Sequence, residues 1–318
     1  MLQQINKKIS LELKLRILYI LKQLKKFNPK EQILIFSDPR GGSTWLTEII
    51  HTIPNTAIIW EPLNIHNVKT VKNLGFGWRQ YIPENQTWLE AENVINKICS
   101  GKIVNEWTML VTNVKDYYKA NQLIVKICRG NMLLPWITNR IEFKFSPIYL
   151  IRHPFAVVAS QMKQGGWNSP FRKFEVPKIP FNEIYQEHIK FLTSLSTKEE
   201  ILIAYWCLTN KISLNHPNNN TKWITVYYEK LLLHPGHEIQ RIFKTWNMPV
   251  PKDIEKTYQK KSSTTLGEMN THDPKIQLAK WKRELNKTQI NKMQRVLDYF
   301  EITSYSWDKL TPRIDDNA

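Results

Sequence analysis

The sequence predicts an α/β fold, with a mostly parallel central sheet covered by helices on both faces. Short apolar runs rich in β-branched residues recur along the 318 residues, and stretches with helical periodicity fall between or after them. This alternation is typical of a parallel sheet with helical crossover connections. The 42% hydrophobic and 23% charged residues are ordinary for a globular chain and argue against disorder. We expect one large domain, because no linker divides the chain.

The apolar runs predict five strands, at residues 32–36, 57–60, 122–127, 147–151 and 223–228. The helical patterns fall at residues 43–52, 131–139, 154–163, 180–195, 198–214, 235–246 and 287–300. The last helix is the best marked, because Asn286 is a favoured N-cap and Gln289 completes a capping box. Ligands of parallel sheets bind beyond the carboxyl ends of the strands, so the polar residues that follow each run form the candidate site.

Residues 1–30 are predicted to form a basic amphipathic helix that packs on a domain of residues 31–310. Glu12, Lys14 and Arg16 interrupt its apolar run, which therefore falls short of the ~20 apolar residues that cross a bilayer. The segment also lacks the small-residue cleavage site of a secretory signal. Peripheral contact with a membrane is the alternative to packing on the domain.

The cysteines indicate the redox environment of the protein, and the net charge indicates which kinds of partner it could attract. Cys99, Cys128 and Cys207 form no CxxC pair, which suits a reducing cytosol and predicts a cytoplasmic protein. Forty-five Lys and Arg against 28 Asp and Glu leave a formal charge of +17, which attracts phosphates, acidic polymers, nucleic acid or anionic membranes. A general enrichment in lysine would give the same excess, so charge alone selects no partner. The tail at residues 311–318 is expected to be flexible.

The stretch "SDPRGGSTWL" (37–46) predicts an anion-binding turn between a strand and a helix. Two adjacent glycines, in a chain with only ten, follow an apolar run and precede a helical pattern that opens at Ser43 or Thr44. A helix that starts there points free backbone N–H groups and two hydroxyls at whatever lies above the turn. The stretch is not the ATP- and GTP-binding P-loop, because it lacks the G-x-x-x-x-G-K-[ST] pattern. A purely structural Gly-Gly turn is the alternative.

A second stretch, "YLIRHPFAVVASQM" (149–162), predicts another anion site. It places Arg152 at a strand end and Pro154 in the first turn of a helix, where proline is favoured. Ser160 follows about two turns later and can share a face with the start of the helix. An arginine and a serine so placed can hold a phosphate. A surface arginine and a helix-buried serine are the alternative.

Together, "PRGGSTW" and "RHPFAVVAS" resemble the two nucleotide-binding motifs of the PAPS-dependent sulfotransferases (PAPS is 3′-phosphoadenosine-5′-phosphosulfate). The family patterns are P-[KR]-[SG]-G-[ST]-[ST]-[WFL] and R-x-P-x-x-x-x-x-S, and both occur here in the family's order. The resemblance implies a P-loop-NTPase-like sulfotransferase architecture that covers most of the chain, with PAPS as the donor. The nucleotide-binding residues that it implies are Arg40, Gly41, Gly42, Ser43 and Thr44 for the 5′-phosphosulfate, Trp45 for the adenine, and Arg152 and Ser160 for the 3′-phosphate.

Three weaker matches extend the resemblance. "VYYEKLLLHP" is similar to the family's Y-E-D-L stretch and implies that Tyr228 lies near the nucleotide, although Lys230 replaces the usual acidic residue. "DPKIQLAKWKRELNKTQI" is similar to a C-terminal region in which a basic residue reaches the 3′-phosphate, which implies Lys275. "KKSSTTLGEMN" resembles the family's Thr/Ser patch near the nucleotide, with Ser263 or Thr264 as candidates.

One departure from the family concerns the general base. Small-molecule members carry K-[TS]-H on the third strand and use its histidine, whereas "VKICRG" keeps Lys126 but has Cys128 at the histidine position. A buried cysteine is a poor base. Glu61, at the end of the second strand, lies in the region where some bacterial and carbohydrate members carry a glutamate base. We therefore expect Glu61 to be the base, its pKa raised by partial desolvation against the pull of nearby cations. His66 is the next candidate, and a salt-bridged or helix-capping Glu61 is the alternative.

One further task in sulfuryl transfer concerns the leaving group. The leaving phosphate must be neutralised, and we assign this to Arg40. No metal is expected, because the sequence has no HExxH and no clustered Cys and His, and a sulfuryl group bears less charge than a γ-phosphate.

Two insertions rich in aromatic and basic residues, 74–90 and 164–178, predict the acceptor site. Tryptophans can stack on sugar rings, and arginine and lysine attract an acidic chain. The candidates are Trp78, Trp88 and Trp167, with Arg79, Arg172 and Lys173. The missing histidine favours the bacterial or carbohydrate branch, so we expect a hydroxyl (or amine) of a carbohydrate or glycolipid as the acceptor. Loop anchors packed on the core are the alternative.

Two other functions stay open at the level of sequence. One is a kinase-like phosphotransferase with a degenerate P-loop, against which the missing Gly-Lys-[Ser/Thr] speaks. The other is a non-catalytic polyanion-binding protein. No recognised nucleic-acid motif occurs, so no nucleic acid is expected as a partner. The sequence does not indicate an oligomeric state.

Overall fold

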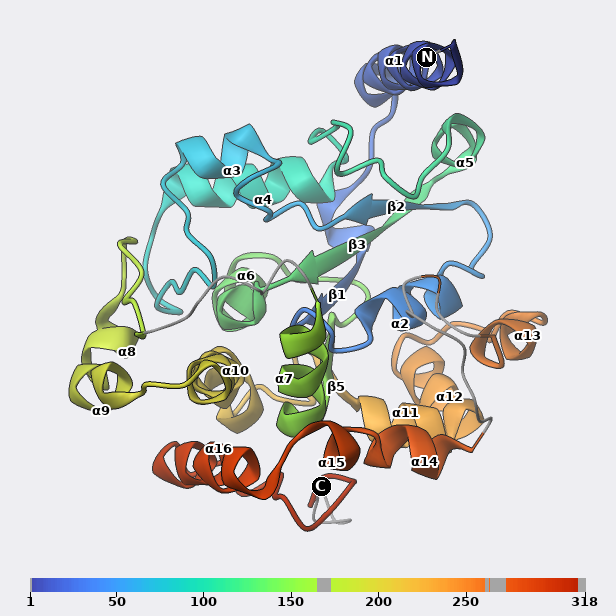
Figure 1. Cartoon of the computed structure of the whole chain (residues 1–318). Coiled ribbons are helices and arrows are strands. Elements are labelled where there is room, and N and C mark those ends of the chain that lie inside the picture. Colours follow the sequence, from blue (N-terminus) through green and yellow to red (C-terminus); the bar gives the residue numbers. More distant parts are fainter. Residues whose placement is uncertain (1, 165–172, 261–262, 264–272, 314–318) are drawn as a thin grey trace.

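The structure is a computed structural model that describes residues 2–164, 173–260, 263 and 273–313. Its centre is a sheet of five strands in the order β2-β3-β1-β4-β5, and every pairing is parallel (Figure 1). The strands are β1 Ile33–Ser37, β2 Thr56–Trp60, β3 Gln122–Cys128, β4 Ile148–Ile151 and β5 Ile224–Tyr227. The predicted α/β fold with a mostly parallel sheet is confirmed. All five strands lie within two residues of the predicted runs.

The register aligns the carboxyl ends of the three central strands. Ser37, the last residue of β1, pairs with Cys128 at the end of β3 and with Leu150 near the end of β4. The residues that follow these strands therefore emerge at one edge of the sheet. Because β1 lies between β3 and β4, the loop after β1 occupies the middle of that edge.

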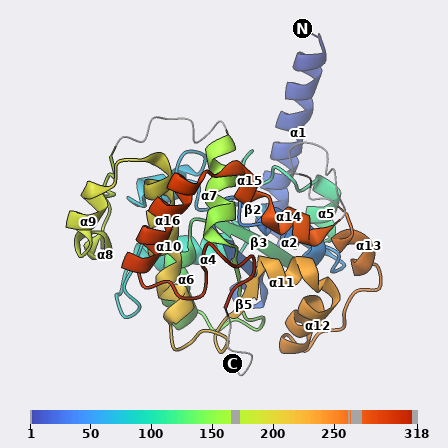
Figure 2. The same ribbon diagram turned by 60° about the horizontal axis from the view of Figure 1, so that its bottom comes forward.

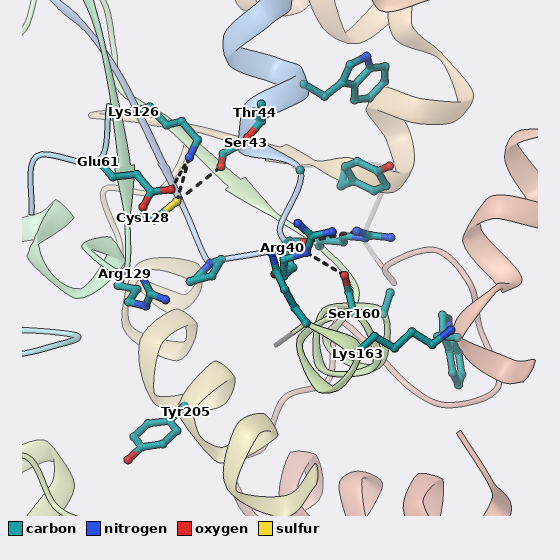
Figure 3. Close-up of a pocket in the computed structure, with 18 of the residues that line it drawn as sticks. Arg40, Ser43, Thr44, Glu61, Lys126, Cys128, Arg129, Ser160, Lys163 and Tyr205 are labelled. Carbon is teal, nitrogen blue, oxygen red and sulfur yellow. Dashed lines mark hydrogen bonds and ion pairs between the residues drawn. The ribbon is translucent and has the colours of Figure 1, made fainter. Parts of the chain in front are cut away.

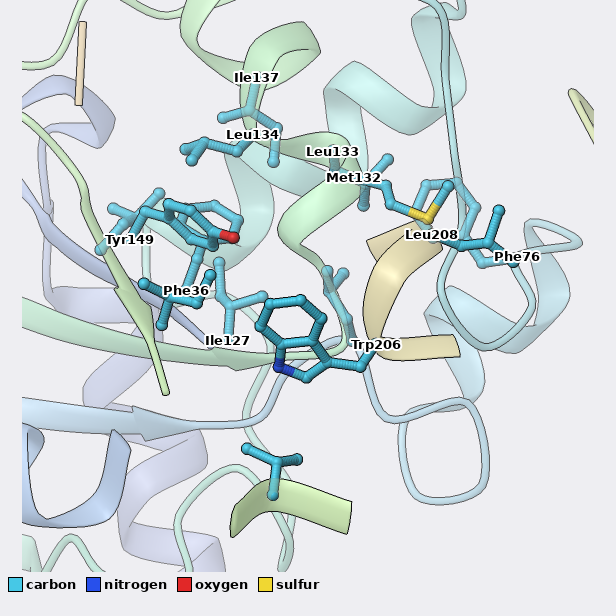
Figure 4. Close-up of a cluster of buried hydrophobic side chains, with 14 of the residues drawn as sticks. Phe36, Phe76, Ile127, Met132, Leu133, Leu134, Ile137, Tyr149, Trp206 and Leu208 are labelled. Carbon is cyan, nitrogen blue, oxygen red and sulfur yellow. The ribbon is translucent and has the colours of Figure 1, made fainter. Parts of the chain in front are cut away.

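Both faces of the sheet are covered by helices, as the alternation along β1 shows. Ile33 and Ile35 belong to one hydrophobic core, while Leu34 and Phe36 belong to the other. The first core is closed by α2 Ser43–Ile50, α11 Tyr228–Leu233, α12 Pro235–Thr245, α13 Ile254–Tyr258 and α14 Pro274–Ala279. The second is closed by α4 Leu89–Cys99, α6 Leu134–Arg140, α7 Pro154–Lys163, α10 Lys198–Asn215 and α16 Lys287–Tyr299 (Figure 4). Strands buried on both faces explain why the predicted runs are continuous rather than alternating.

Two predicted elements need correction. The single helix expected at 180–195 is two short helices, α8 Glu183–Gln186 and α9 Ile189–Ser194. The chain turns at His188, whose ring packs edge-on against Phe300 and whose Nδ1 lies 3.1 Å from the Tyr299 hydroxyl. These tertiary contacts outweigh the helical pattern. The strand expected to reach Tyr228 ends one residue earlier, because Tyr228 opens α11.

The N-terminal helix α1, Leu2–Leu24, packs on the domain along one face only. Leu18 is fully buried, Lys14 Nζ donates to the Met109 carbonyl (2.8 Å), and Lys25 Nζ donates to the Ala120 carbonyl (2.6 Å). Its N-terminal end projects away from the body of the protein (Figure 2). In the ranges that the structure covers, no helix is long and apolar enough to cross a membrane. Residues 314–318 of the predicted tail lie outside the described residues.

The remaining short helices are α3 Lys69–Asn73, α5 Val114–Lys119 and α15 Trp281–Glu284. The predicted capping box of α16 is present, because Asn286 and Gln289 exchange hydrogen bonds with each other's backbone N–H.

Replacement of Phe36 by alanine tests the assignment of the second core. The side chain is fully buried in β1, so Phe36→Ala should lower the free energy of unfolding by about 3–5 kcal/mol, the usual cost of emptying such a site. Leu89→Ala is the control, since this leucine is exposed and its loss should cost less than about 0.5 kcal/mol. Denaturant unfolding measures both, and equal losses would contradict the burial described here.

Candidate active site

A cleft of about 2320 Å³ opens at the carboxyl edge of the sheet, as the strand-end argument predicts. All five strands or the residues directly after them line it (Figure 3). The contributions include Pro39–Arg40 and Gly42–Trp45 after β1, Trp60–Glu61 at the end of β2, Lys126 and Cys128–Arg129 at the end of β3, Arg152 after β4 and Tyr228 after β5.

The lining is strongly basic. Ten lysines and arginines face three glutamates, and such a field concentrates anions in the cleft. The basic residues are Arg40, Arg79, Lys126, Arg129, Arg152, Lys163, Lys178, Lys260, Lys280 and Arg283, and the acidic ones are Glu61, Glu175 and Glu284. Arg129, Lys163 and Lys280 were not predicted. Arg129 had a visible cue, because it directly follows the strand that carries Lys126 and Cys128.

The turn after β1 has the geometry of an anion cradle. Arg40 and Gly42 have left-handed backbones (φ +70° and +94°), and α2 begins at Ser43 as expected. A Cβ atom on Gly42 would come within 2.5 Å of the Tyr228 ring, and one on Gly41 within 2.9 Å of the Asp38 carbonyl. A larger residue at either glycine would therefore clash with its neighbours. The residues at the start of α2, whose backbone N–H groups have no partner within the helix, line the cleft.

The two predicted anion sites meet in this cleft. Arg40 Nε donates to Ser160 Oγ (2.9 Å), and Arg152 donates from its terminal nitrogen to the Arg40 carbonyl (3.1 Å). The Arg152 guanidinium lies 4.4 Å from the centre of the Tyr228 ring. Its Nε is buried and has no hydrogen-bond partner among the described residues. A bound phosphate would satisfy this donor, since a buried polar group without a partner is costly.

The half-buried Glu61 and the buried Lys126 form an ion pair on the other side of the cleft. Lys126 Nζ lies 2.7 Å from Glu61 Oε1 and 3.4 Å from Cys128 Sγ, and it lies over the Trp60 ring at 3.8 Å. Burial alone would raise the pKa of Glu61, but the Lys126 charge and hydrogen bond outweigh it and hold this pKa below its usual range. The expected rise is therefore wrong. Burial raises the pKa of the Cys128 thiol to about 11, so the thiol is protonated at neutral pH.

Trp78 and Arg79, both predicted, lie in the wall of the cleft. The Arg129 guanidinium stacks over Trp78 at 4.4 Å, and His66 packs edge-on against the same indole at 5.1 Å. Arg79 stacks over Tyr205 at 4.3 Å.

The other acceptor candidates lie elsewhere. Trp88 packs on Phe76 and Phe181, outside the lining, as a loop anchor would. Lys173 is exposed and is not among the lining residues, while Trp167 and Arg172 lie outside the described residues.

A family comparison identifies the fold family. Residues 30–307 match the family model of the sulfotransferase domain, which is most of the chain. The chain belongs to the sulfotransferase family. This shows a transferase of the sulfotransferase type, in agreement with the resemblance of the two motifs. No curated protein sequence matches the chain.

The chain is similar to solved sulfotransferase structures at low identity. The sulfotransferase domain from the Synechococcus PCC 7002 olefin synthase is 17% identical over 87% of this chain and 96% of its own, with a TM-score of 0.45. The sulfotransferase domain from the curacin biosynthetic pathway is 18% identical over 85% and 97%, also with a TM-score of 0.45. Mouse sulfotransferase SULT7A1, complexed with PAP, is 13% identical over 91% and 89%, with a TM-score of 0.43.

The C-terminal part of the sulfotransferase domain supplies one wall of the cleft. Gln277 on α14 donates to the Tyr228 hydroxyl (2.9 Å), and Trp281 stacks on Phe155 at 5.0 Å. Lys275 is exposed on α14 and is not among the lining residues, whereas Lys280 is.

Of the predicted Thr/Ser patch, Ser263 donates from its hydroxyl to Glu48, and Thr264 lies outside the described residues. Among the residues described, no group of three or more His, Cys, Asp and Glu is arranged to hold a metal ion.

A buried carboxylate positions Arg152 in this sulfotransferase domain. Glu229 accepts hydrogen bonds from the backbone N–H of His153 (2.8 Å) and from the Tyr305 hydroxyl (3.1 Å). It thereby ties the start of α7 to α11 and to the C-terminal segment. Burial raises the pKa of Glu229 to about 7.

Glu229→Gln should remove part of the pH dependence of stability. The folded protein holds the Glu229 proton up to about pH 7, whereas the ordinary pKa is 4.5, so stability falls as pH rises through this window. The contribution is roughly 3 kcal/mol between the two limits. Glutamine keeps the acceptor for His153 but cannot ionise. Denaturant unfolding should be measured at about pH 5 and about pH 8. The free energy of unfolding should fall less between these two pH values in the variant than in the parent protein. Glu301→Gln, at an exposed glutamate, is the control and should behave like the parent. If the free energy of unfolding of Glu229→Gln falls with pH as much as that of the parent, the raised pKa of Glu229 is wrong.

Proposed function

We propose that the protein transfers the sulfuryl group of PAPS to a hydroxyl or amine of a carbohydrate or glycolipid, releasing adenosine 3′,5′-bisphosphate. The observation that carries the proposal is the pairing of two anion sites in one cleft, linked by the Arg40–Ser160 hydrogen bond. A nucleotide with phosphates at both the 5′ and the 3′ positions needs such a pair. An ordinary nucleoside triphosphate does not.

The residues present fit this donor. The start of α2, with Gly42 to Thr44, would hold the 5′-phosphosulfate through backbone N–H groups and two hydroxyls. The predicted Gly41 is not among the lining residues, and its N–H donates to the Asp38 carbonyl (2.9 Å), so it shapes the turn. Arg152 and Ser160 would hold the 3′-phosphate, and the buried Nε of Arg152 would gain its partner there. Trp45 and Tyr228, packed edge to face at 5.9 Å, offer an aromatic wall for the adenine.

Basic residues on α14 and directly after it extend the phosphate site. Lys280 lines the cleft and offers a second cation for the 3′-phosphate, and the exposed Lys275 stays a proposal for the same role.

The transfer breaks the bond between the sulfur and the bridging phosphate oxygen and forms a bond between the sulfur and the acceptor oxygen or nitrogen. Negative charge grows on the leaving phosphate. Arg40 would neutralise it, because it lines the cleft and its Nε bonds Ser160, while its terminal nitrogens make no hydrogen bond with another described residue. The hydroxyls of Ser43 and Thr44 would add donors on the same side.

Glu61 would take the acceptor's proton. It lines the cleft, and its lowered pKa keeps it ionised at neutral pH, so it can accept a proton without first losing one. Lys126 holds the carboxylate in place at 2.7 Å. Cys128 cannot compete, because its thiol keeps its own proton.

The acceptor would bind beside the donor. Clefts for one drug-sized ligand measure about 300–1,000 Å³, so a cleft of about 2320 Å³ leaves room for a second substrate. The indole of Trp78 offers a stacking face for a sugar ring, while Arg79 and Arg129 favour an acidic one.

Adenosine 3′,5′-bisphosphate should bind roughly 10- to 100-fold more tightly than AMP. An arginine–phosphate contact contributes about 1.5–3 kcal/mol, and AMP lacks the 3′-phosphate. Calorimetry measures both, and Arg152→Ala should bring the two affinities together while Arg16→Ala, at an exposed arginine on α1, should not. Equal affinities in the parent protein, or a preference for ATP with magnesium, would refute PAPS as the donor.

Glu61→Gln should retain nucleotide binding and lose about 10²–10⁴-fold in turnover, the usual contribution of a general base. Because the pKa of Glu61 is lowered, the acidic limb of the parent's pH–rate profile should lie below pH 4.5, and it should vanish in the variant. Glu175→Gln, at another carboxylate of the cleft, is the control and should change turnover little. If Glu61→Gln stays within about threefold of the parent, the base is another residue, with His66 next to be tested.

A further inference from the structure

Exposed apolar side chains gather on one side of the molecule, around α1. Twelve large hydrophobic residues are exposed in the described part of the chain, and seven of them lie on α1 or on the segments beside it. The seven are Leu13, Tyr19, Ile20, Leu24, Leu110, Val111 and Tyr118. Scattered exposed hydrophobics are ordinary, but a contiguous group marks an interaction surface.

The helix itself has two apolar faces. Leu18 faces the domain and is fully buried. Leu13, Ile20 and Leu24 are spaced by seven and four residues, which places them on one face of the helix, and they are 58%, 60% and 72% exposed. No described residue covers this outer face. A helix that served only to pack on the domain would carry polar residues there.

Contacts of α1 connect this face to the mouth of the cleft. Lys14 Nζ donates to the carbonyl of Met109, directly before the exposed Leu110 and Val111. Leu110 also lines the cleft, so it stands at the opening. Tyr118 belongs to α5, which lies next to α1 (Figure 1). The outer face of α1 and the residues 110–111 thus form one surface, which we call the α1 face.

The charges of the α1 face indicate which kind of partner it can bind. Arg16 shares the face of Leu13, Ile20 and Leu24. Two further lysines flank this face: Lys22, whose Nζ lies 3.8 Å from the ring of the exposed Tyr19, and Lys26 just after α1. The helix has the single acidic residue Glu12, in a chain with a formal charge of +17. Two copies that met through this face would bring like charges together, which disfavours a dimer. An apolar stripe with a basic rim instead fits the headgroup region of an anionic bilayer, in which the apolar side chains insert and the cations remain at the phosphates.

We propose that the α1 face docks the protein on anionic lipid bilayers, with Leu13, Ile20 and Leu24 inserted at the interface. The contact is peripheral, since none of the helices in the described ranges could span a membrane. The residues of α1 that would insert are not among those that line the cleft, so the proposal does not rest on the transfer reaction.

Vesicle sedimentation tests the docking. The full chain should sediment with vesicles of phosphatidylcholine and phosphatidylglycerol and much less with phosphatidylcholine alone. Ile20→Glu and Leu24→Glu should each lower the apparent partition coefficient by roughly tenfold, because each removes one inserted side chain. Arg16→Gln should lower it by roughly fivefold, since one cation near an anionic surface contributes about that factor. Val250→Glu, at an exposed residue between α12 and α13, is the matched control and should leave it unchanged.

Further measurements distinguish membrane docking from misfolding of the variants and from dimer formation through the α1 face. Circular dichroism and thermal unfolding of each variant should match the parent, because the replaced side chains are exposed. Binding that persists in the α1 variants, or falls equally in Val250→Glu, would overturn the proposal. So would a dimer in sedimentation velocity that Ile20→Glu dissociates while vesicle binding is unaffected, because the α1 face would then bind a second copy. Calorimetry with adenosine 3′,5′-bisphosphate should be the same for Ile20→Glu and the parent, so a failed docking surface cannot be mistaken for a failed nucleotide site.

Discussion

The concentration of positive charge at one edge of the sheet is the constraint on which the rest of the structure depends. A parallel sheet brings all strand ends to the same side, and here three of the five ends, those of β1, β3 and β4, deliver cations to one cleft. These cations repel one another: burial and the neighbouring Arg152 lower the pKa of Arg40, and burial and Arg79 lower the pKa of Arg129. Such a cluster persists only where buried carboxylates or a bound anion compensate it.

Two buried carboxylates, Asp38 and Glu229, and the half-buried Glu61 lie near these cations, and the three differ in burial and in pKa. Asp38 and Glu229 lie beneath the cleft, and burial raises their pKa values to about 6 and about 7. Each is held by neutral donors, Asp38 by the Asn210 amide and Glu229 by His153 and Tyr305. Glu61 has a lysine at 2.7 Å instead, keeps a low pKa and lines the cleft. The first two support the loops around the cleft. Among the three, Glu61 alone lines the cleft with a lowered pKa, and the proposed role of proton acceptor rests on this difference.

The parts of the site that the sequence predicted are those that neighbouring residues encode. The turn at residues 39–45 follows from adjacent glycines between a strand and a helix, and Arg152 and Ser160 follow from the spacing of one helix. What was missed depends on contacts across the fold. Tyr228 starts a helix and closes over Gly42, the break at His188 depends on Phe300, and the stacking of Arg129 on a tryptophan joins separate loops. The direction of the Glu61 pKa was missed for the same reason, because burial and the ion pair act in opposite directions and only the distance to Lys126 decides between them.

The α1 face bears on the acceptor through Leu110, which belongs to both surfaces. A substrate dissolved in water needs only the charged cleft, and exposed apolar residues at its mouth would add nothing to its binding and would favour aggregation. A glycolipid acceptor would contact these apolar residues as well as the charged cleft. Its sugar would enter beside Trp78 and Arg129 while its acyl chains stay in the bilayer next to Leu110 and the outer face of α1. The membrane would then hold the acceptor at the opening of the cleft. Because confinement to the bilayer raises the effective concentration of the acceptor, the cleft would not need a high affinity for the sugar alone.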